Sequence, residues 1–147
     1  YELNCGLKII NDSYNANPAS MEAALTTVQG IRKGKRTVAV LGDMFELAES
    51  SKQEHRQIGE LVVWSGFDYL FAVGDYAGDM VAAARQAGMS SGKVLKFNCK
   101  KELAVHIKTL FDRAQLGSED MVLVKGSRGM RMEEVIEHLQ CQFDDQG

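Results

Sequence analysis

The segment Thr37-Val38-Ala39-Val40-Leu41-Gly42-Asp43 decides the fold. Five apolar or β-branched residues follow one another without a charge, and a glycine and an aspartate end the run. A strand that is apolar on both faces is typical of a parallel sheet covered by helices on both sides. The segment therefore predicts a buried strand over residues 37–41, followed by a tight turn.

Four further short apolar runs predict strands, and helical periodicity fills the intervals between them. The strand runs are Leu7–Ile10, Tyr69–Val73, Val94–Phe97 and Met121–Val124. Apolar residues spaced by three and four predict helices over Ala19–Gly30, Ser51–Ser65, Tyr76–Ala87, Lys101–Gln115 and Met132–Gln140. Asn17, followed by Pro18, is expected to cap the first of these helices, and Asn98 the fourth. The alternation predicts an α/β fold: a doubly wound, mostly parallel sheet with helices on both faces.

Length and composition exclude several classes of protein. The 147 residues fit one domain spanning 1–147, and a formal net charge of −3 without a basic stripe argues against nucleic-acid binding. No apolar run approaches the roughly 18 residues that a membrane span needs. Cys5, Cys99 and Cys141 lack metal-ligand spacing, so we expect three unpaired thiols in a reducing cytoplasm. The first residues carry neither a start methionine nor a signal peptide, and we expect a piece of a longer protein.

In a doubly wound sheet, ligands bind beyond the carboxyl ends of the strands. The loop after the first strand is Asn11-Asp12-Ser13-Tyr14-Asn15-Ala16-Asn17-Pro18. Capping of the next helix accounts for Asn17 and Pro18 but leaves Asp12, Tyr14 and Asn15 without a role. A carboxylate at a strand end suits a ribose hydroxyl pair or a metal ion, which favours a binding site over pure capping.

Two more loops carry chemistry at the same edge. In Gly42–Leu47, Asp43 and Glu46 stand beside apolar residues, which suits a small ligand with an ammonium group and equally suits an ordinary loop packed into the core. Lys125–Arg131 combines three cations, a hydroxyl and two glycines between a strand and a helix, which favours an anion site over a solvated basic loop. Arg128 is suited to gripping a carboxylate with two parallel hydrogen bonds.

Other signals do not support a catalytic centre. Gly30–Thr37 has the wrong spacing for a P-loop and precedes a strand, and no GxGxxG follows the first strand. His55, His106 and His138 lack metal spacing, and no arrangement of a nucleophile with a base is recognisable. We therefore predict neither a catalytic residue nor a metal ligand within this chain.

Taken together and in this order, three segments resemble the C-terminal domain of the Mur ligase family, in the branch that adds D-alanyl-D-alanine. The segments are Asn11–Met21, Leu41–Leu47 and Val124–Glu133, and His55 followed by Gly59 also matches. The resemblance covers essentially the whole chain and implies a Rossmann-like domain. One departure is Ala48, where family members often have glycine.

The resemblance implies a three-domain cytoplasmic bacterial enzyme of peptidoglycan precursor synthesis. In this family ATP phosphorylates the carboxylate of UDP-MurNAc-tripeptide, and the amine of D-Ala-D-Ala attacks the acyl phosphate. ATP and Mg²⁺ are held mainly by the central domain, and the C-terminal domain closes against the central and N-terminal domains. This chain alone is therefore expected to be inactive, and the full-length protein is expected to be an ATP-dependent peptide ligase.

The resemblance also implies roles for individual residues. Asp12 and Tyr14 are expected on the nucleotide side, with Asp12 against the ATP ribose. The residues expected to bind the dipeptide are Asn15, Asn17, Asp43, Lys125, Ser127 and Arg128.

Two alternatives remain open from the residues. Asn11-Asp12, Asp75 and Lys125 mimic the acid, phosphoacceptor and lysine set of a receiver-like signalling module, although Gly126 stands where receivers usually have proline. A sister Mur or folylpolyglutamate ligase domain would perform the same chemistry on another amine, and the loop Tyr14–Pro18 argues against it.

Overall fold

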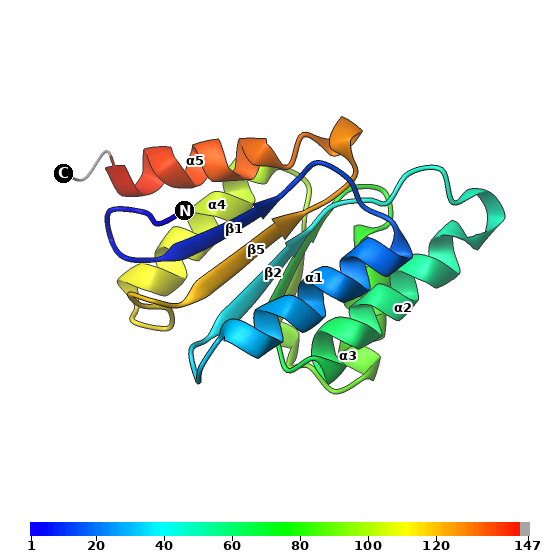
Figure 1. Cartoon of the computed structure of the whole chain (residues 1–147), viewed down its shortest axis with the longest axis horizontal. Helices are drawn as coiled ribbons and strands as arrows, with labels where there is room; N and C mark the ends of the chain where they lie inside the picture. The colour runs from blue at the N-terminus through cyan, green and yellow to red at the C-terminus, as the bar shows by residue number, and fades with distance from the viewer. Residues whose placement is uncertain (145–147) are drawn as a thin grey trace.

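The computed structural model describes residues 1–144, which contain one five-stranded sheet (Figure 1). All strand pairs are parallel, and the spatial order is β1-β5-β2-β3-β4. The strands are β1 (Lys8–Asp12), β2 (Thr37–Leu41), β3 (Tyr69–Val73), β4 (Val94–Phe97) and β5 (Met121–Lys125). Every residue of β2, β3 and β5 is buried, whereas the edge strands β1 and β4 are partly exposed. The uncharged runs in the sequence therefore mark the centre of the sheet, and the predicted parallel sheet is confirmed.

Helices cover both faces of this sheet (Figure 1). On one face lie α1 (Pro18–Ile31), α2 (Ser51–Trp64) and α3 (Ala77–Gln86), and on the other α4 (Lys100–Asp112) and α5 (Glu133–Asp144). Three short 3₁₀ turns are η1 (Ala48–Ser50), η2 (Ser91–Lys93) and η3 (Arg128–Met130). Alternate side chains of β2 point to opposite faces of the sheet. Val38 and Val40 lie in the core between the sheet and α4 and α5, while Ala39 and Leu41 lie in the core between the sheet and α1, α2 and α3. The doubly wound architecture is thus confirmed.

One glycine allows α2 and α3 to pack closely. A Cβ atom on Gly59 would lie 2.2 Å from the backbone carbonyl oxygen of Met80 on α3. Backbone cannot yield as a side chain tip can, so this contact fixes the distance between the two helices.

Several predicted boundaries are corrected by the structure. β1 runs on to Asp12, because the strand stays paired with β5 through the partner residues Asp12 and Lys125. Cys99 rather than Asn98 is the N-cap of α4, without a side-chain cap. The helix α5 continues past Gln140 because Phe143 is buried against α4.

Two global expectations can be compared with the described residues. Cys5, Cys99 and Cys141 are free thiols. Among residues 1–144, no helix combines the length and the apolar character that crossing a bilayer requires.

The strand order creates a crevice at the edge where β1 and β5 end. The chain leaves β1 for α1 on one face of the sheet, and it leaves the neighbouring β5 for α5 on the opposite face (Figure 1). Neighbouring strands whose connections diverge in this way form a topological switch point, where open α/β sheets bind ligands. The fold therefore places the first and third candidate loops side by side.

Candidate ligand-binding cleft

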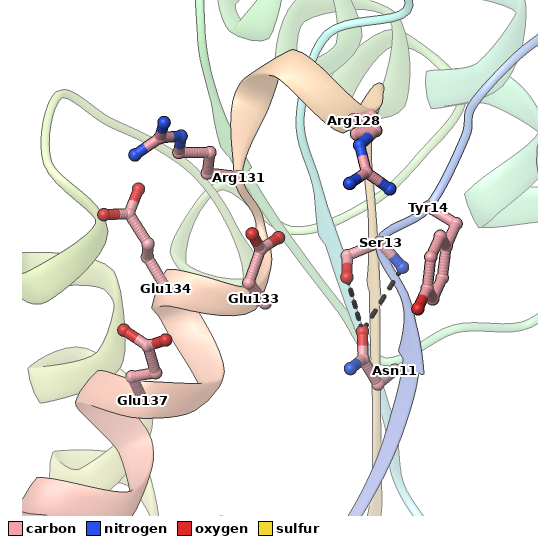
Figure 2. Close-up of a pocket in the computed structure, with 8 residues that line it drawn as sticks. All are labelled: Asn11, Ser13, Tyr14, Arg128, Arg131, Glu133, Glu134 and Glu137. Carbon is pink, nitrogen blue, oxygen red and sulfur yellow. Dashed lines mark hydrogen bonds between the residues drawn. The ribbon is translucent and has the colours of Figure 1, made fainter.

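A cleft of about 670 Å³ opens at this switch point (Figure 2). The end of β1 and the loop after it form one wall, and η3 with the first turns of α5 forms the other. The lining residues are Asn11, Ser13, Tyr14, Arg128, Arg131, Glu133, Glu134 and Glu137. This volume lies within the range of small-molecule sites, although the lining is more polar than in most of them.

The cleft carries charges of both signs. Figure 2 shows the Arg128 side chain near Tyr14, while Glu133, Glu134 and Glu137 project from α5 farther from Tyr14. Arg128, Arg131, Glu133 and Glu137 form no ion pair with any residue in the described part of the chain. Unpaired cations facing unpaired carboxylates suit a ligand that itself has a negative and a positive end.

Glu134 is the exception, because it is held by α4. Lys100 Nζ lies 2.8 Å from Glu134 Oε1 and also donates a hydrogen bond to the Met130 carbonyl oxygen. The hydrogen bond from Lys100 lowers the pKa of Glu134 below its ordinary value. Lys100 therefore ties η3 to the start of α5 and leaves Glu134 ionised at the mouth of the cleft.

Lys125, which the resemblance implies in dipeptide binding, is not among the residues that line the cleft. Its side chain is only 2% exposed, and Nζ donates hydrogen bonds to Asp12 Oδ2 at 2.9 Å and to the Asn15 carbonyl oxygen at 2.8 Å. A buried ammonium needs such partners, so Lys125 pins the loop after β1 onto β5. Asp12 remains 43% exposed, so its carboxylate can accept a further hydrogen bond from a ligand.

Ser127 and Asp43 also connect loops. Ser127 Oγ accepts a hydrogen bond from the Phe45 backbone N–H at 2.7 Å and lies 3.4 Å from the Ala16 carbonyl oxygen, to which it donates. The buried carboxylate of Asp43 accepts from the backbone N–H groups of Asp75 at 2.8 Å and Tyr76 at 2.9 Å. These hydrogen bonds hold the loops after β1, β2, β3 and β5 in fixed relative positions, because buried polar groups must find partners inside the protein.

The turn that receives Asp43 depends on glycine. Gly74 has φ +123°, in a region that L-residues rarely adopt, and a Cβ atom there would lie 2.6 Å from the Asp43 carboxylate. The absence of a side chain at Gly74 allows the carboxylate to reach the two N–H groups beyond it.

Asn17 and Asn15 both form hydrogen bonds with nearby backbone groups, but only Asn17 caps a helix. Asn17 Oδ1 accepts from the Ser20 backbone N–H at 2.8 Å, and Ser20 Oγ accepts from the Asn17 N–H at 3.0 Å, which completes a capping box. The capping interpretation of Asn17 is confirmed. Asn15 Oδ1 accepts from the Ala16 N–H at 2.9 Å, and the residue is exposed.

His55 has a structural role that its position in the sequence did not reveal. The Met44 backbone N–H donates to His55 Nε2 at 2.9 Å, so Nδ1 carries the proton and lies 2.6 Å from the Ser51 carbonyl oxygen. The buried ring stacks on Tyr76 with centroids 4.4 Å apart. Met44 is buried as well, so the core-packing interpretation of this loop holds for Met44, whereas Phe45 is 45% exposed.

Of the residues predicted to bind ligands, Tyr14 and Arg128 line the cleft and present exposed side chains. The sequence interpretation missed the acidic wall, although Glu133 and Glu137 stand four residues apart, the spacing that places two side chains on one face of a helix. Within residues 1–144, no three side chains of His, Cys, Asp or Glu gather as metal ligands.

Comparisons with known proteins place this geometry in context. The model of the family described as "Mur ligase, glutamate ligase domain" matches residues 2–128. The UDP-N-acetylmuramoyl-tripeptide–D-alanyl-D-alanine ligase of Bacillus subtilis (strain 168) is 34% identical over 134 residues, covering 91% of this chain and 28% of that protein. The ligase of the same name from Escherichia coli (strain K12) is 37% identical over 132 residues, covering 90% of this chain and 26% of that protein.

Solved structures give the same result. The MurF ligase from Thermotoga maritima in complex with ADP superposes with a TM-score of 0.77 at 25% identity, covering 100% of this chain and 31% of that one. A MurF structure from Acinetobacter baumannii superposes with a TM-score of 0.79 at 32% identity, covering 93% of this chain and 29% of that one. The chain thus spans between about a quarter and a third of the length of the relatives it matches.

Proposed function

The chain belongs to the Mur ligase family, and on that premise we propose that it is the C-terminal domain of a ligase that joins D-alanyl-D-alanine to UDP-N-acetylmuramoyl-tripeptide. Relatives with that name, matched over about nine-tenths of this chain, support the substrate assignment. In this proposal residues 1–147 are one domain of a three-domain enzyme that acts in the bacterial cytoplasm on a cell-wall precursor.

The observation that carries the proposal is the exposed Arg128, which forms no ion pair within residues 1–144 and lies in a switch-point cleft that also contains carboxylates from α5. D-Ala-D-Ala is a small zwitterion with one carboxylate, one ammonium group and two methyl groups. A guanidinium fork binds a carboxylate with two parallel hydrogen bonds. Arg128 binds the carboxylate of the dipeptide, and Asn15, which follows Tyr14 in the loop after β1, presents an exposed amide as a further polar contact.

The reaction assigns a limited task to this domain. The γ-phosphoryl group of ATP passes to the tripeptide carboxylate, and the dipeptide amine then attacks the acyl carbon, loses a proton and displaces phosphate. The C-terminal domain binds the dipeptide, orients its amine and shields the acyl phosphate from water when the domains close. Arg128 fixes the end of the dipeptide that does not react.

The nucleotide is shared with the central domain. The exposed part of the Asp12 carboxylate accepts a hydrogen bond from the ATP ribose, while Lys125 holds its other oxygen. The resemblance to Mur ligases assigns Mg²⁺, like the phosphates of ATP, to the central domain. The isolated chain is accordingly inactive, because phosphoryl transfer takes place outside it.

The test compares Arg128→Ala with Arg113→Ala in the full-length ligase. Arg113 is an exposed arginine that follows the last residue of α4, at the end of the sheet where the strands begin. It lies away from the cleft and serves as the matched control. We expect Arg128→Ala to raise the KM for D-Ala-D-Ala by about 10- to 100-fold, the effect of removing a charge-assisted hydrogen-bonding group. The KM for ATP should stay within about twofold. An equal rise in both KM values, or no rise, would remove Arg128 from the carboxylate role.

The receiver-like alternative conflicts with the strand order. Two strands, β5 and β2, lie between β1 and β3, so at about 4.8 Å per strand the positions of Asp12 and Asp75 are roughly 14 Å apart. A receiver needs both acidic groups around one Mg²⁺. Incubation with acetyl phosphate and Mg²⁺ should therefore leave Asp75 unphosphorylated, as intact-mass spectrometry can verify.

A further inference from the structure

Tyr14 is the most exposed of the large apolar or aromatic side chains in the described residues, at 75%. It lies in the loop after β1, lines the cleft and takes no part in either hydrophobic core. Folding therefore does not explain an aromatic ring at this position.

The ring contacts one charged group. The guanidinium carbon of Arg128 lies 5.7 Å from the centroid of the Tyr14 ring, within the range of a cation–π contact. Figure 2 shows the two side chains projecting into the cleft from different elements, Tyr14 from the β1 side and Arg128 from η3. The pair thus bridges the two walls of the cleft.

The backbone on both sides of this pair is fixed. Lys125 and Ser127, just before Arg128, hydrogen-bond to the carbonyl oxygens of Asn15 and Ala16, just after Tyr14. These hydrogen bonds, which are mostly buried, set the separation of the two backbone segments without a ligand. Within the described residues, Arg128 has no ion pair that would compete for its position.

We propose that Tyr14 is a positioning residue, whose ring holds the Arg128 guanidinium in the orientation that receives the dipeptide carboxylate. This inference rests on the proposed function, and it gives Tyr14 a role on the dipeptide side in place of the nucleotide side that the resemblance implies. An aromatic ring engages the face of a guanidinium, whereas the N–H donors lie in the plane of the group and remain free for a carboxylate. An arginine side chain loses considerable rotamer freedom when it is fixed, and the contact with Tyr14 removes part of that freedom before the ligand arrives.

The kinetic test uses the full-length ligase with Tyr14→Leu, Tyr14→Phe and the control Trp64→Leu. Trp64 is also exposed, at 69%, but it is the last residue of α2 and lies at the end of the sheet where the strands begin, away from the cleft. We expect Tyr14→Leu to raise the KM for D-Ala-D-Ala about fivefold, the size of an exposed cation–π contact, with kcat and the KM for ATP unchanged. Tyr14→Phe should have the wild-type KM for D-Ala-D-Ala, because the ring and not the hydroxyl acts on Arg128. Trp64→Leu should leave the same KM unchanged.

A double variant separates this inference from the proposed function. In an Arg128→Ala background, Tyr14→Leu should cause no further rise in the KM for the dipeptide, because the group that it positions is gone. Additive effects, or a rise in the KM for ATP, would overturn the positioning role while leaving the ligase assignment intact. If Arg128→Ala itself leaves the KM for D-Ala-D-Ala unchanged, Arg128 does not bind the carboxylate, and the positioning role of Tyr14 is refuted as well.

A measurement without substrate completes the test. In the 147-residue chain, the Arg128 side-chain signals in NMR spectra should be shifted by the ring current of Tyr14. That shift should disappear in Tyr14→Leu and persist in Tyr14→Phe. Unshifted Arg128 signals in the wild-type chain would contradict the contact on which the inference depends.

Discussion

Removing either partner of the ion pair between Asp12 and Lys125 should have unequal consequences. Lys125→Met leaves behind a carboxylate that is 43% exposed and a carbonyl in an exposed loop residue, so water replaces the lost hydrogen bonds. We expect a loss of about 1–2 kcal/mol in the free energy of unfolding. Asp12→Ala instead leaves an ammonium group, 2% exposed, with a single carbonyl partner. An uncompensated buried charge is more costly, and we expect a loss of about 3 kcal/mol.

Urea unfolding of the 147-residue chain at neutral pH measures these losses, provided that the m-values stay constant. The double variant Asp12→Ala/Lys125→Met should resemble Lys125→Met alone, since no buried charge remains. Lys8 and Glu119 provide a matched control, an ion pair of 2.8 Å whose side chains are 41% and 45% exposed, and breaking it should change stability little. The reasoning is refuted if Lys125→Met is as costly as Asp12→Ala, or if the two losses add.

Three further changes probe packing, backbone strain and protonation. Gly59→Ala should cost about 2–3 kcal/mol in urea unfolding, because its Cβ would meet the Met80 carbonyl oxygen at 2.2 Å and force α2 from α3. Ala48→Gly should raise stability by about 0.5–1 kcal/mol in thermal melts, because Ala48 has a left-handed φ of +51°. Burial lowers the pKa of His106, so the neutral ring is favoured in the fold and stability should fall as the pH drops below about 6.5. His106→Phe should reduce that loss, and urea midpoints at pH 8 and pH 5 would show it.

The central strands could be predicted because burial on both faces requires an uninterrupted run of uncharged residues, which is visible in the sequence. Thr37–Leu41 and Tyr69–Val73 contain no charge, and both are observed with the predicted bounds. The edge strand β1 was predicted less well. It remains partly exposed, and its polar end, Asn11-Asp12, resembles a loop until pairing with β5 is known.

The site could be predicted by region but only partly by residue. The three loops do lie at one edge, as the alternation of strands and helices requires. However, the type of residue at a position does not reveal whether its partner is a ligand or a distant part of the same chain. Lys125 is a cation at a strand end, but it meets Asp12, 113 positions earlier in the sequence. Asp43 similarly meets backbone N–H groups of Asp75 and Tyr76 on the next loop.

The placement of β5 has a consequence for how the protein is made. Of the five described strands, β5 is the last to be synthesised, yet it lies between β1 and β2. Lys8 on β1 therefore cannot pair until Met121 on β5 has been made. A nascent chain that ends before Met121 has its first strand without a neighbour and one open edge on β2. Such unpaired edges are where chains associate wrongly. The two walls of the cleft come from residues 11–14 and 128–137, so the cleft forms only after both segments have been synthesised.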